Sequence, residues 1–339
     1  MSAAAAPAGG DPHGARERRG AGRLPRLLFL VGPTAVGKTA VAIELAERLE
    51  TEILSIDSRQ AYRRLTIGTA KPSAAEQARV RHHLLDLFAP DEVASAAVFA
   101  AHYERARATL AVRAATVLAV GGSGLYVDAC LGRLDRLPPA DPAVRAEHAA
   151  RRAREGCLGL HRELAAIDPP TAARLAPGDF KRISRALEVF ALTGTPLSRL
   201  QTRRTPPDLG RDPRLLLLTR ERAELDARIA ARGRAMLAAG LLDELRSLLA
   251  EGVSASAPGL QAIGYGDFLG VLAGREPLDA ALARFLQRTR RYARRQLTWF
   301  RNRYRGVTEV RLSAGLSAEQ GAERCLQALR DSEPGAAAT

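Results

Sequence analysis

The stretch from Leu27 to Ala40, LLFLVGPTAVGKTA, restricts the fold of this 339-residue chain more than any other. Its residues 32–39 fit the pattern G-x-x-x-x-G-K-[ST], with an apolar run before them and a helical pattern after them. In such a loop, backbone N–H groups and a helix amino terminus surround phosphate oxygens. Lys38 adds a cation, and the Thr39 hydroxyl can ligate magnesium. The stretch therefore predicts a phosphate-binding loop between a strand and a helix, without saying whose phosphates it holds.

Further apolar runs at 52–56, 116–120 and 215–218 predict three more strands. Longer segments with helical periodicity separate them, which favours a parallel sheet covered by helices. The predicted fold is α/β, a P-loop NTPase-like parallel sheet flanked by helices, with a mainly helical insertion. The main helices are expected at 38–49, 96–113, 180–192, 223–239 and 278–302.

Residues 138–179 contain no strand-like run, and prolines bracket a charged, alanine-rich stretch. We expect a helical insertion at 138–179 in a core domain formed by 24–137 and 180–331; a continuous single domain with extra helices is the alternative. Residues 1–23 are rich in Ala, Gly and Arg, and we expect disordered tails at 1–23 and 332–339.

The formal charge of +14 indicates an anionic partner, and nucleic acid is favoured over a membrane. Only Lys38, Lys71 and Lys181 are lysines, so a composition bias towards arginine accounts for part of this charge. Three distant cysteines form neither a disulfide framework nor a zinc pair, which favours a reducing cytoplasm. No apolar run reaches the length of a membrane span.

Asp57 follows the second predicted strand in SIDSRQAY, at the sheet edge where ligands bind in open α/β folds. It can serve as a general base, as a magnesium-ordering acid or as a helix cap. The third predicted strand runs into GGSGLY, residues 121–126, without the acid that nucleotide hydrolases carry there. The loop therefore need not serve hydrolysis. The HHLLD stretch at 82–86 is interpreted as structural, because no further histidine stands at metal-ligand spacing.

Residues 284–305 contain nine arginines and no acid. Arginines interleaved with Tyr292, Trp299 and Phe300 suit phosphate contacts and stacking on unpaired bases. We interpret this helix as an RNA-binding face; an exposed helix in an arginine-biased chain is the alternative.

These pieces resemble the tRNA dimethylallyltransferase family, of the bacterial type that lacks a zinc-finger extension. The matching motifs are GPTAVGKT, DSRQAY, GTAKP at 68–72, HHLLD, GGSGLY, KRISRALEVF at 181–190, QAIGY at 261–265 and TRRYARRQLTWFR at 289–301. They stand in the family's order across about residues 27–302. Two positions depart from the family's pattern: Ser123 replaces a threonine, and Ala-Pro-Gly-Asp at 176–179 replaces His-Pro-Asn-Asp.

The resemblance implies transfer of a dimethylallyl group from dimethylallyl diphosphate to the exocyclic amine of the adenosine 3′-adjacent to the anticodon of tRNA. Mg²⁺ is the implied cofactor, with Thr39 as its protein ligand, in a cytoplasmic, monomeric enzyme. Asp57 is implied as the base, acting with Thr34, Lys38 and Thr39. The implied diphosphate site consists of Gly32, Pro33, Thr34, Ala35, Val36, Gly37, Lys38, Thr39, Arg228 and Arg232.

The resemblance also implies contacts with the anticodon stem-loop, around a pocket that receives a flipped base. The implied tRNA-binding residues are Asp57, Ser58, Arg59, Gln60, Ser123, Arg145, Lys181, Arg182, Ile183, Ser184, Arg185, Gln261, Ala262, Ile263, Gly264, Tyr265 and Gly266. Three other functions stay open: prenyl transfer to free adenine nucleotides, a P-loop small-molecule kinase, and a non-catalytic RNA-binding protein. The lysines all fall in matching motifs, which suggests that these positions need a compact ammonium.

Overall fold

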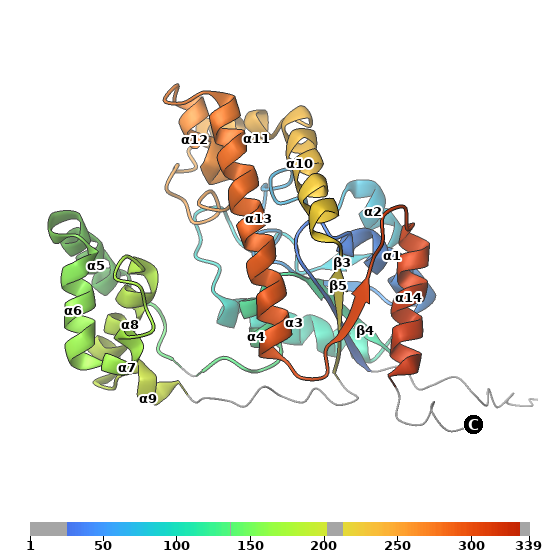
Figure 1. Cartoon of the computed structure of the whole chain (residues 1–339), viewed down its shortest axis with the longest axis horizontal. Helices are drawn as coiled ribbons and strands as arrows, with labels where there is room; N and C mark the ends of the chain where they lie inside the picture. Colours follow the sequence, from blue (N-terminus) through green and yellow to red (C-terminus); the bar gives the residue numbers. More distant parts are fainter. Residues whose placement is uncertain (1–25, 136, 202–212, 333–339) are drawn as a thin grey trace, which may run out of the picture.

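A parallel sheet of six strands forms the centre of the computed structural model, which describes residues 26–135, 137–201 and 213–332 (Figure 1). The strands lie in the order β3-β2-β4-β1-β5-β6, and every neighbouring pair is parallel. Their bounds are β1 (Leu27–Val31), β2 (Ile53–Ile56), β3 (His82–His83), β4 (Val117–Gly121), β5 (Arg214–Thr219) and β6 (Thr308–Arg311). The predicted tail at 1–23, and residues 333–339 of the other, lie outside the described residues.

The four predicted strands are confirmed as β1, β2, β4 and β5, and with them the α/β class. The sequence patterns missed both edge strands. β3 is only two residues long, and β6 has a single buried residue, Val310, so neither contains an apolar run. Edge strands bury less surface than central ones, which removes the hydrophobic pattern used to find them.

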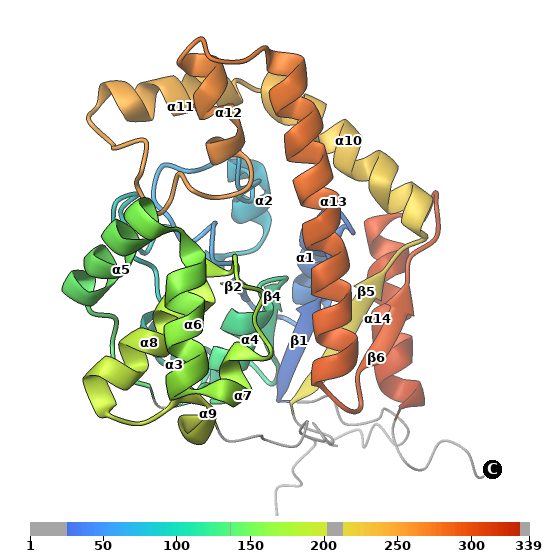
Figure 2. The same ribbon diagram turned by 60° about the vertical axis from the view of Figure 1, so that its left-hand side comes forward.

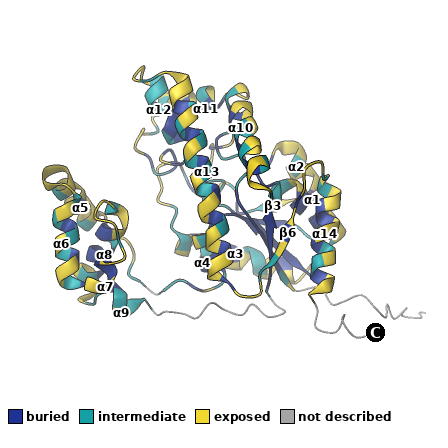
Figure 3. Cartoon of the chain, in the orientation of Figure 1, coloured by how far each residue is buried: buried dark blue, intermediate teal, exposed yellow. Residues whose placement is uncertain are grey.

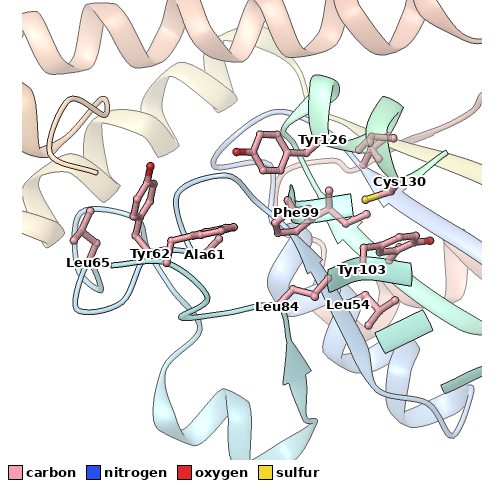
Figure 4. Packing of buried hydrophobic residues seen from close by; sticks show 14 of the residues in the cluster. Leu54, Ala61, Tyr62, Leu65, Leu84, Phe99, Tyr103, Tyr126 and Cys130 are labelled. Atoms are coloured by element: carbon pink, nitrogen blue, oxygen red, sulfur yellow. The ribbon is translucent and has the colours of Figure 1, made fainter. Parts of the chain in front are cut away.

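Successive side chains of β1 point to opposite faces of the sheet, and each face packs on its own layer of helices. Leu28 and Leu30 lie in the core formed with α1 and α14. Phe29 and Val31 lie in the other core, with aromatic residues of α3 and α4 such as Tyr103 (Figure 4). Figure 3 shows that the central strands β1, β2, β4 and β5 are buried between these layers.

Nine helices of the described chain belong to the sheet domain, and α13 is the longest, with 26 residues. α13 packs against α10, α12 and α4, so it spans the sheet domain from one end to the other (Figures 1 and 2). None of the described helices is both long and apolar enough to cross a membrane. The nine are α1 (Lys38–Arg48), α2 (Ala74–Arg79), α3 (Ala96–Ala111), α4 (Gly124–Cys130), α10 (Arg222–Ala238), α11 (Leu241–Ala250), α12 (Tyr265–Leu272), α13 (Leu278–Arg303) and α14 (Ala318–Asp331).

Five further helices stand beside the sheet as a group (Figure 2). They are α5 (Pro142–Glu155), α6 (Cys157–Ile167), α7 (Pro169–Ala172), α8 (Phe180–Thr193) and α9 (Leu197–Leu200). Leu160 and Leu164 of α6 share a separate hydrophobic cluster with Ile183 and Leu187 of α8. We expected the insertion to end at residue 179; because α8 packs into this cluster, we propose a helical unit that runs to Leu200.

Candidate active site

The phosphate-binding loop joins β1 to α1, and Gly37 (φ +108°) begins the helix in a conformation that glycine adopts without strain. Lys38 Nζ donates to the carbonyl oxygens of Gly32 (3.0 Å) and Pro33 (2.8 Å). Burial lowers the pKa of the Lys38 ammonium to about 8, the charge of Asp57 opposes this effect, and the charge of Arg232 adds to it. The loop therefore has one cation at its centre, and that cation titrates near neutral pH.

Three arginines at and after the end of β5 lie beside the loop. Arg228 Nε donates to Ala35 O (2.8 Å), and burial lowers the pKa of Arg232 while Asp57 opposes the effect. The two arginines named from the sequence are thus next to the loop. Arg220 was missed; its Nε donates to Val36 O (2.8 Å). Its place at the carboxyl end of a predicted strand was the available sequence clue.

Asp57 lies at the carboxyl end of β2 and uses one oxygen to hold the turn that follows it. Its Oδ1 accepts from the N–H groups of Arg59 (2.8 Å) and Gln60 (3.3 Å). Its Oδ2 accepts no hydrogen bond from any residue that the structure describes. Asp57 therefore caps a turn with one oxygen and has the other available for a ligand.

Two cavities meet at Asp57, and they differ in chemistry. The larger, about 540 Å³, is lined by Lys38, Thr39, Arg228 and other polar residues of the loop. The smaller, about 210 Å³, has an apolar wall formed by Ile229, Met236, Ile263 and Phe285. Both are lined by Thr34, Ala35, Asp57, Thr69, Arg232 and Tyr292. A ligand with an anionic and an apolar end can therefore occupy both cavities beside Asp57.

The turn after β4 lies next to the Asp57 turn. Ser58 N–H donates to Ser123 Oγ (3.2 Å), so Ser123 is attached to the Asp57 turn.

Tyr292 of α13 lines both cavities. Its burial, and to a smaller extent the charge of Asp57, raises the pKa of Tyr292 to about 12. Gln296 also lines the larger cavity, and the sequence analysis did not single it out.

The GTAKP segment, residues 68–72, forms another wall and is held at several points. Gln60 Nε2 donates to Ala70 O (2.9 Å). Lys71 Nζ donates to Tyr62 O (2.9 Å) and to Asp86 Oδ1 (2.5 Å), which joins this segment to HHLLD. Tyr265 OH accepts from Gly68 N–H (3.0 Å).

Of the predicted residues 261–266, Ile263 lines the smaller cavity. Gln261 is exposed, and its Nε2 donates to Ala255 O (2.8 Å). Ala262 and Gly264 are buried, and Gly266 N–H donates to Ala262 O (3.2 Å) inside the chain.

Residues 181–185 begin α8 in the helical unit and line neither cavity. Lys181 and Arg182 are exposed, whereas Ile183 and Ser184 are buried among the helices. Asp179 caps α8 by accepting from Arg182 N–H (3.4 Å). The segment 176–179, which differs from the family's pattern, therefore keeps the residue that begins the helix.

Two predicted arginines of the helical unit share one buried carboxylate. Arg145 Nε donates to Glu188 Oε1 (2.8 Å), and Arg185 Nη1 donates to Glu188 Oε2 (2.5 Å). Glu188 is fully buried, and although burial opposes the change, these two arginines lower its pKa. The pair holds α5 and α8 together, with part of the Arg145 side chain still exposed.

The arginine-rich helix α13 is partly neutralised by acids from other segments. Five of the nine arginines at 284–305 form ion pairs with Asp267, Glu276, Asp226, Glu309 or Asp128. In the described part of the chain, Arg291, Arg294, Arg295 and Arg305 form none. Residues 284–305 therefore carry less unpaired positive charge than their acid-free sequence indicates.

The predicted stacking role of Phe300 is wrong, because this side chain is fully buried in the core. Trp299 is about one-third exposed (36%) and lines a surface cavity of about 590 Å³ with Arg291, Arg294 and Arg295. Trp299 thus lies among three arginines that form no ion pair within the described chain.

Both histidines of HHLLD lie close to polar groups of the same chain. His83 Nε2 lies 2.5 Å from Glu52 Oε2, and His82 Nδ1 lies 2.8 Å from Val80 O. Across the described ranges, no three His, Cys, Asp or Glu side chains gather as a metal site would require.

Known proteins share the sequence and the fold of this chain. Residues 60–303 match the family model described as IPP transferase. The chain is 48% identical to the tRNA dimethylallyltransferase of Halorhodospira halophila over 283 residues, covering 83% of this chain and 91% of that protein. It is also 48% identical to the tRNA dimethylallyltransferase of Methylibium petroleiphilum, covering 81% and 86%. The crystal structure of the tRNA isopentenylpyrophosphate transferase of Bacillus halodurans superposes with a TM-score of 0.64 at 35% identity, covering 90% and 97% of the two chains. The chain belongs to the IPP transferase family.

Proposed function

We propose that this protein transfers a dimethylallyl group from dimethylallyl diphosphate to the exocyclic amine of the adenosine 3′-adjacent to the anticodon in tRNA. One observation carries the proposal: Asp57, with one free oxygen, stands where a cationic cavity meets an apolar one. A prenyl diphosphate has this division into an anionic part and a hydrocarbon part, whereas the ribose and base of a nucleotide carry hydrogen-bonding groups that the apolar wall does not satisfy. The names of the similar enzymes supply the tRNA acceptor.

The diphosphate belongs in the larger cavity. Carbon–oxygen cleavage leaves negative charge on the departing diphosphate, and loop N–H groups, Lys38 and Arg232 are suited to stabilising it. The Thr34 side chain lines the same cavity and would lie against these oxygens.

The donor set of the loop also fits Mg²⁺. A magnesium ion bound to a diphosphate usually takes one or two protein oxygens and several waters, and the Thr39 hydroxyl in the larger cavity is such an oxygen. When bound, the ion would neutralise part of the diphosphate charge.

The dimethylallyl group belongs in the smaller cavity, against Met236 and Phe285. An apolar, partly enclosed site keeps water away from the reacting carbon, which favours the amine over hydrolysis. Asp57 stands beside this site and lines both cavities.

The acceptor step uses Asp57 as the base. The adenine amine attacks the prenyl carbon, a nitrogen–carbon bond forms, the carbon–oxygen bond breaks, and diphosphate leaves. The proton released from the amine goes to Asp57, whose Oδ2 has no competing partner within the described chain. The adenine must leave the stack of tRNA bases to reach Asp57. Ser58, Arg59 and Ser123 lie around Asp57.

The remaining tRNA contacts are proposed on charged surfaces away from the cavities. Arg291, Arg294 and Arg295 of α13 surround Trp299, which suits phosphate contacts with a stacked base. Lys181, Arg182 and Arg145 of the helical unit carry exposed charge that suits the anticodon stem-loop. A tRNA substrate implies a cytoplasmic enzyme, and the free thiols of Cys130, Cys157 and Cys325 suit its reducing conditions.

The alternatives predict different products. A small-molecule kinase would consume ATP, and the missing acid at the end of β4 argues against it. A prenyltransferase for free adenine nucleotides would act on AMP, and it has no need for the unpaired arginines around Trp299. A non-catalytic RNA-binding protein would not depend on Asp57.

One experiment separates these functions. The purified protein is incubated with Mg²⁺, ATP, dimethylallyl diphosphate and either unmodified tRNA or AMP, and both isopentenyladenosine and the remaining ATP are measured by mass spectrometry. Product on tRNA alone supports the proposal. Product on AMP alone, or ATP consumption without prenylated product, would overturn it.

A further inference from the structure

Gln296 of α13 joins the phosphate-binding loop to the turn after β4. The Thr34 N–H donates to Gln296 Oε1 (2.9 Å), and Gln296 Nε2 donates to Gly122 O (2.8 Å). The side chain is buried, with 6% of its surface exposed. Both ends of its amide are therefore bonded to backbone groups of segments that lie 174 and 262 residues away.

The orientation of this amide is determined by its partners. The amide oxygen faces the Thr34 N–H donor, and the amide nitrogen faces the Gly122 carbonyl. A flipped amide would place donor against donor at Thr34 and acceptor against acceptor at Gly122. A glutamine is the side chain that satisfies one donor and one acceptor at this distance and carries no charge.

Gln296 also fills the space beside the end of β4. A Cβ atom added at Gly122 would lie 2.4 Å from Gln296 Nε2, 2.9 Å from Gly32 O and 3.4 Å from Lys38 Nζ. No side chain fits at residue 122 while Gln296 stays in place. The region where nucleotide hydrolases hold an acid is thus occupied by a neutral amide.

The bond to Thr34 fixes the part of the loop that lines both cavities. Thr34 lines both cavities. Lys38 Nζ donates to the carbonyl oxygens of Gly32 and Pro33, the two residues before Thr34. A change at Gln296 therefore acts on the diphosphate end of the site. It does not act directly on Asp57, which is held by its own turn.

We propose that Gln296 is a positioning residue that presets the phosphate-binding loop for the diphosphate of the donor. The proposal rests on the proposed function for the identity of that donor. It predicts that Gln296 sets the affinity for diphosphate and leaves the affinity for tRNA unchanged.

The test replaces Gln296 with methionine, which keeps its length and volume and removes both hydrogen bonds. The control is Gln327→Met on α14, an exposed position whose amide bonds to Asp331 and Arg330 and to no other described residue. In Q296M the KM for dimethylallyl diphosphate should rise about tenfold, because two hydrogen bonds that order the loop are lost. The kcat and the Kd for tRNA should stay within about twofold of wild type, and Q327M should match wild type in all three.

Gln296→Glu is a second variant. It keeps an acceptor for Thr34 N–H, cannot donate to Gly122 O, and places a negative charge beside the diphosphate, so its KM should exceed that of Q296M. It replaces Q296M as the deciding variant if methionine lowers the melting temperature by more than about 5 °C. Full donor affinity in the deciding variant, or a fall in kcat or tRNA affinity with KM unchanged, would overturn the proposal.

Calorimetry with inorganic diphosphate separates this inference from the function. If the wild type forms no prenylated tRNA, the proposed function fails. Weaker binding of inorganic diphosphate by Q296M than by Q327M would still support the positioning role, and equal binding would contradict it.

Discussion

The Asp57 carboxylate and the Lys38 ammonium line one cavity, and the negative charge of Asp57 offsets part of the burial that lowers the pKa of Lys38 to about 8. Lys38 is a cation below that pH and becomes neutral above it. Arg232, half-buried on the same wall, opposes the charged form of Lys38. The charge of the site is therefore set by these three side chains together.

Donor binding should therefore weaken as the pH rises through about 8, because a neutral Lys38 no longer attracts the diphosphate. The Kd for dimethylallyl diphosphate, measured by calorimetry from pH 6.5 to 9.5, should show this rise. In Asp57→Asn the rise should begin at lower pH, because the charge that raises the Lys38 pKa is gone. Lys38→Met should show no such rise, and a wild-type Kd that is flat across this range would contradict the assignment.

Lys71 should not tolerate arginine. Its side chain is 5% exposed and bonds to Tyr62 O and Asp86 Oδ1, so the larger guanidinium would overpack the site. We expect Lys71→Arg to lower the free energy of unfolding in urea by about 1–3 kcal/mol. Lys181→Arg is the matched control: Lys181 is exposed, and the change should stay within about 0.5 kcal/mol. Equal stability of the two variants would show that Lys71 does not need a compact ammonium.

The hydroxyl of Tyr265 should contribute to stability, whereas that of Tyr103 should not. Tyr265 OH accepts from Gly68 N–H and donates to Glu244, so phenylalanine leaves both without this partner. Tyr265→Phe should cost about 1–3 kcal/mol in urea denaturation. The hydroxyl of Tyr103 is buried and unpartnered within the described chain, so Tyr103→Phe should be neutral or stabilising. A larger loss at Tyr103 than at Tyr265 would reverse this ranking.

Arg294 should contact RNA phosphate, since it lies at the Trp299 cavity and forms no ion pair in the described ranges. For Arg294→Ala, the plot of log Kd for tRNA against log salt should become shallower by about 0.7–0.9. Arg330→Ala on α14 is the control, because Arg330 is paired with Glu323 on another surface, and its slope should equal that of the wild type. An unchanged slope for Arg294→Ala would remove this face from the tRNA site.

The sequence was sufficient for the central sheet and for the loop, because both depend on local patterns. The apolar run 27–31 and the glycines of the loop specify β1, the turn and α1 without help from the rest of the chain. Asp57 was found for the same reason, since it follows a recognisable strand.

The remaining parts of the site depend on contacts between distant segments. Gln296 meets Thr34 across 262 residues, and nothing near residue 296 in the sequence marks that contact. The apolar cavity also contains Met236 and Phe285, which come from two separate helices and which the sequence presents as ordinary core residues. The burial of Phe300 and the ion pairs of α13 likewise depend on how that helix is rotated against its neighbours.

Prenyl transfer with Asp57 as the base is tested most directly by Asp57→Asn. Asparagine keeps an oxygen for the N–H groups of Arg59 and Gln60, so the turn should persist while the base is lost. With dimethylallyl diphosphate, Mg²⁺ and unmodified tRNA, the wild type should form isopentenyladenosine and release an equal amount of diphosphate. The variant should bind tRNA normally and turn over about 10²–10⁴ times more slowly. A variant that forms isopentenyladenosine at the wild-type rate would contradict the account.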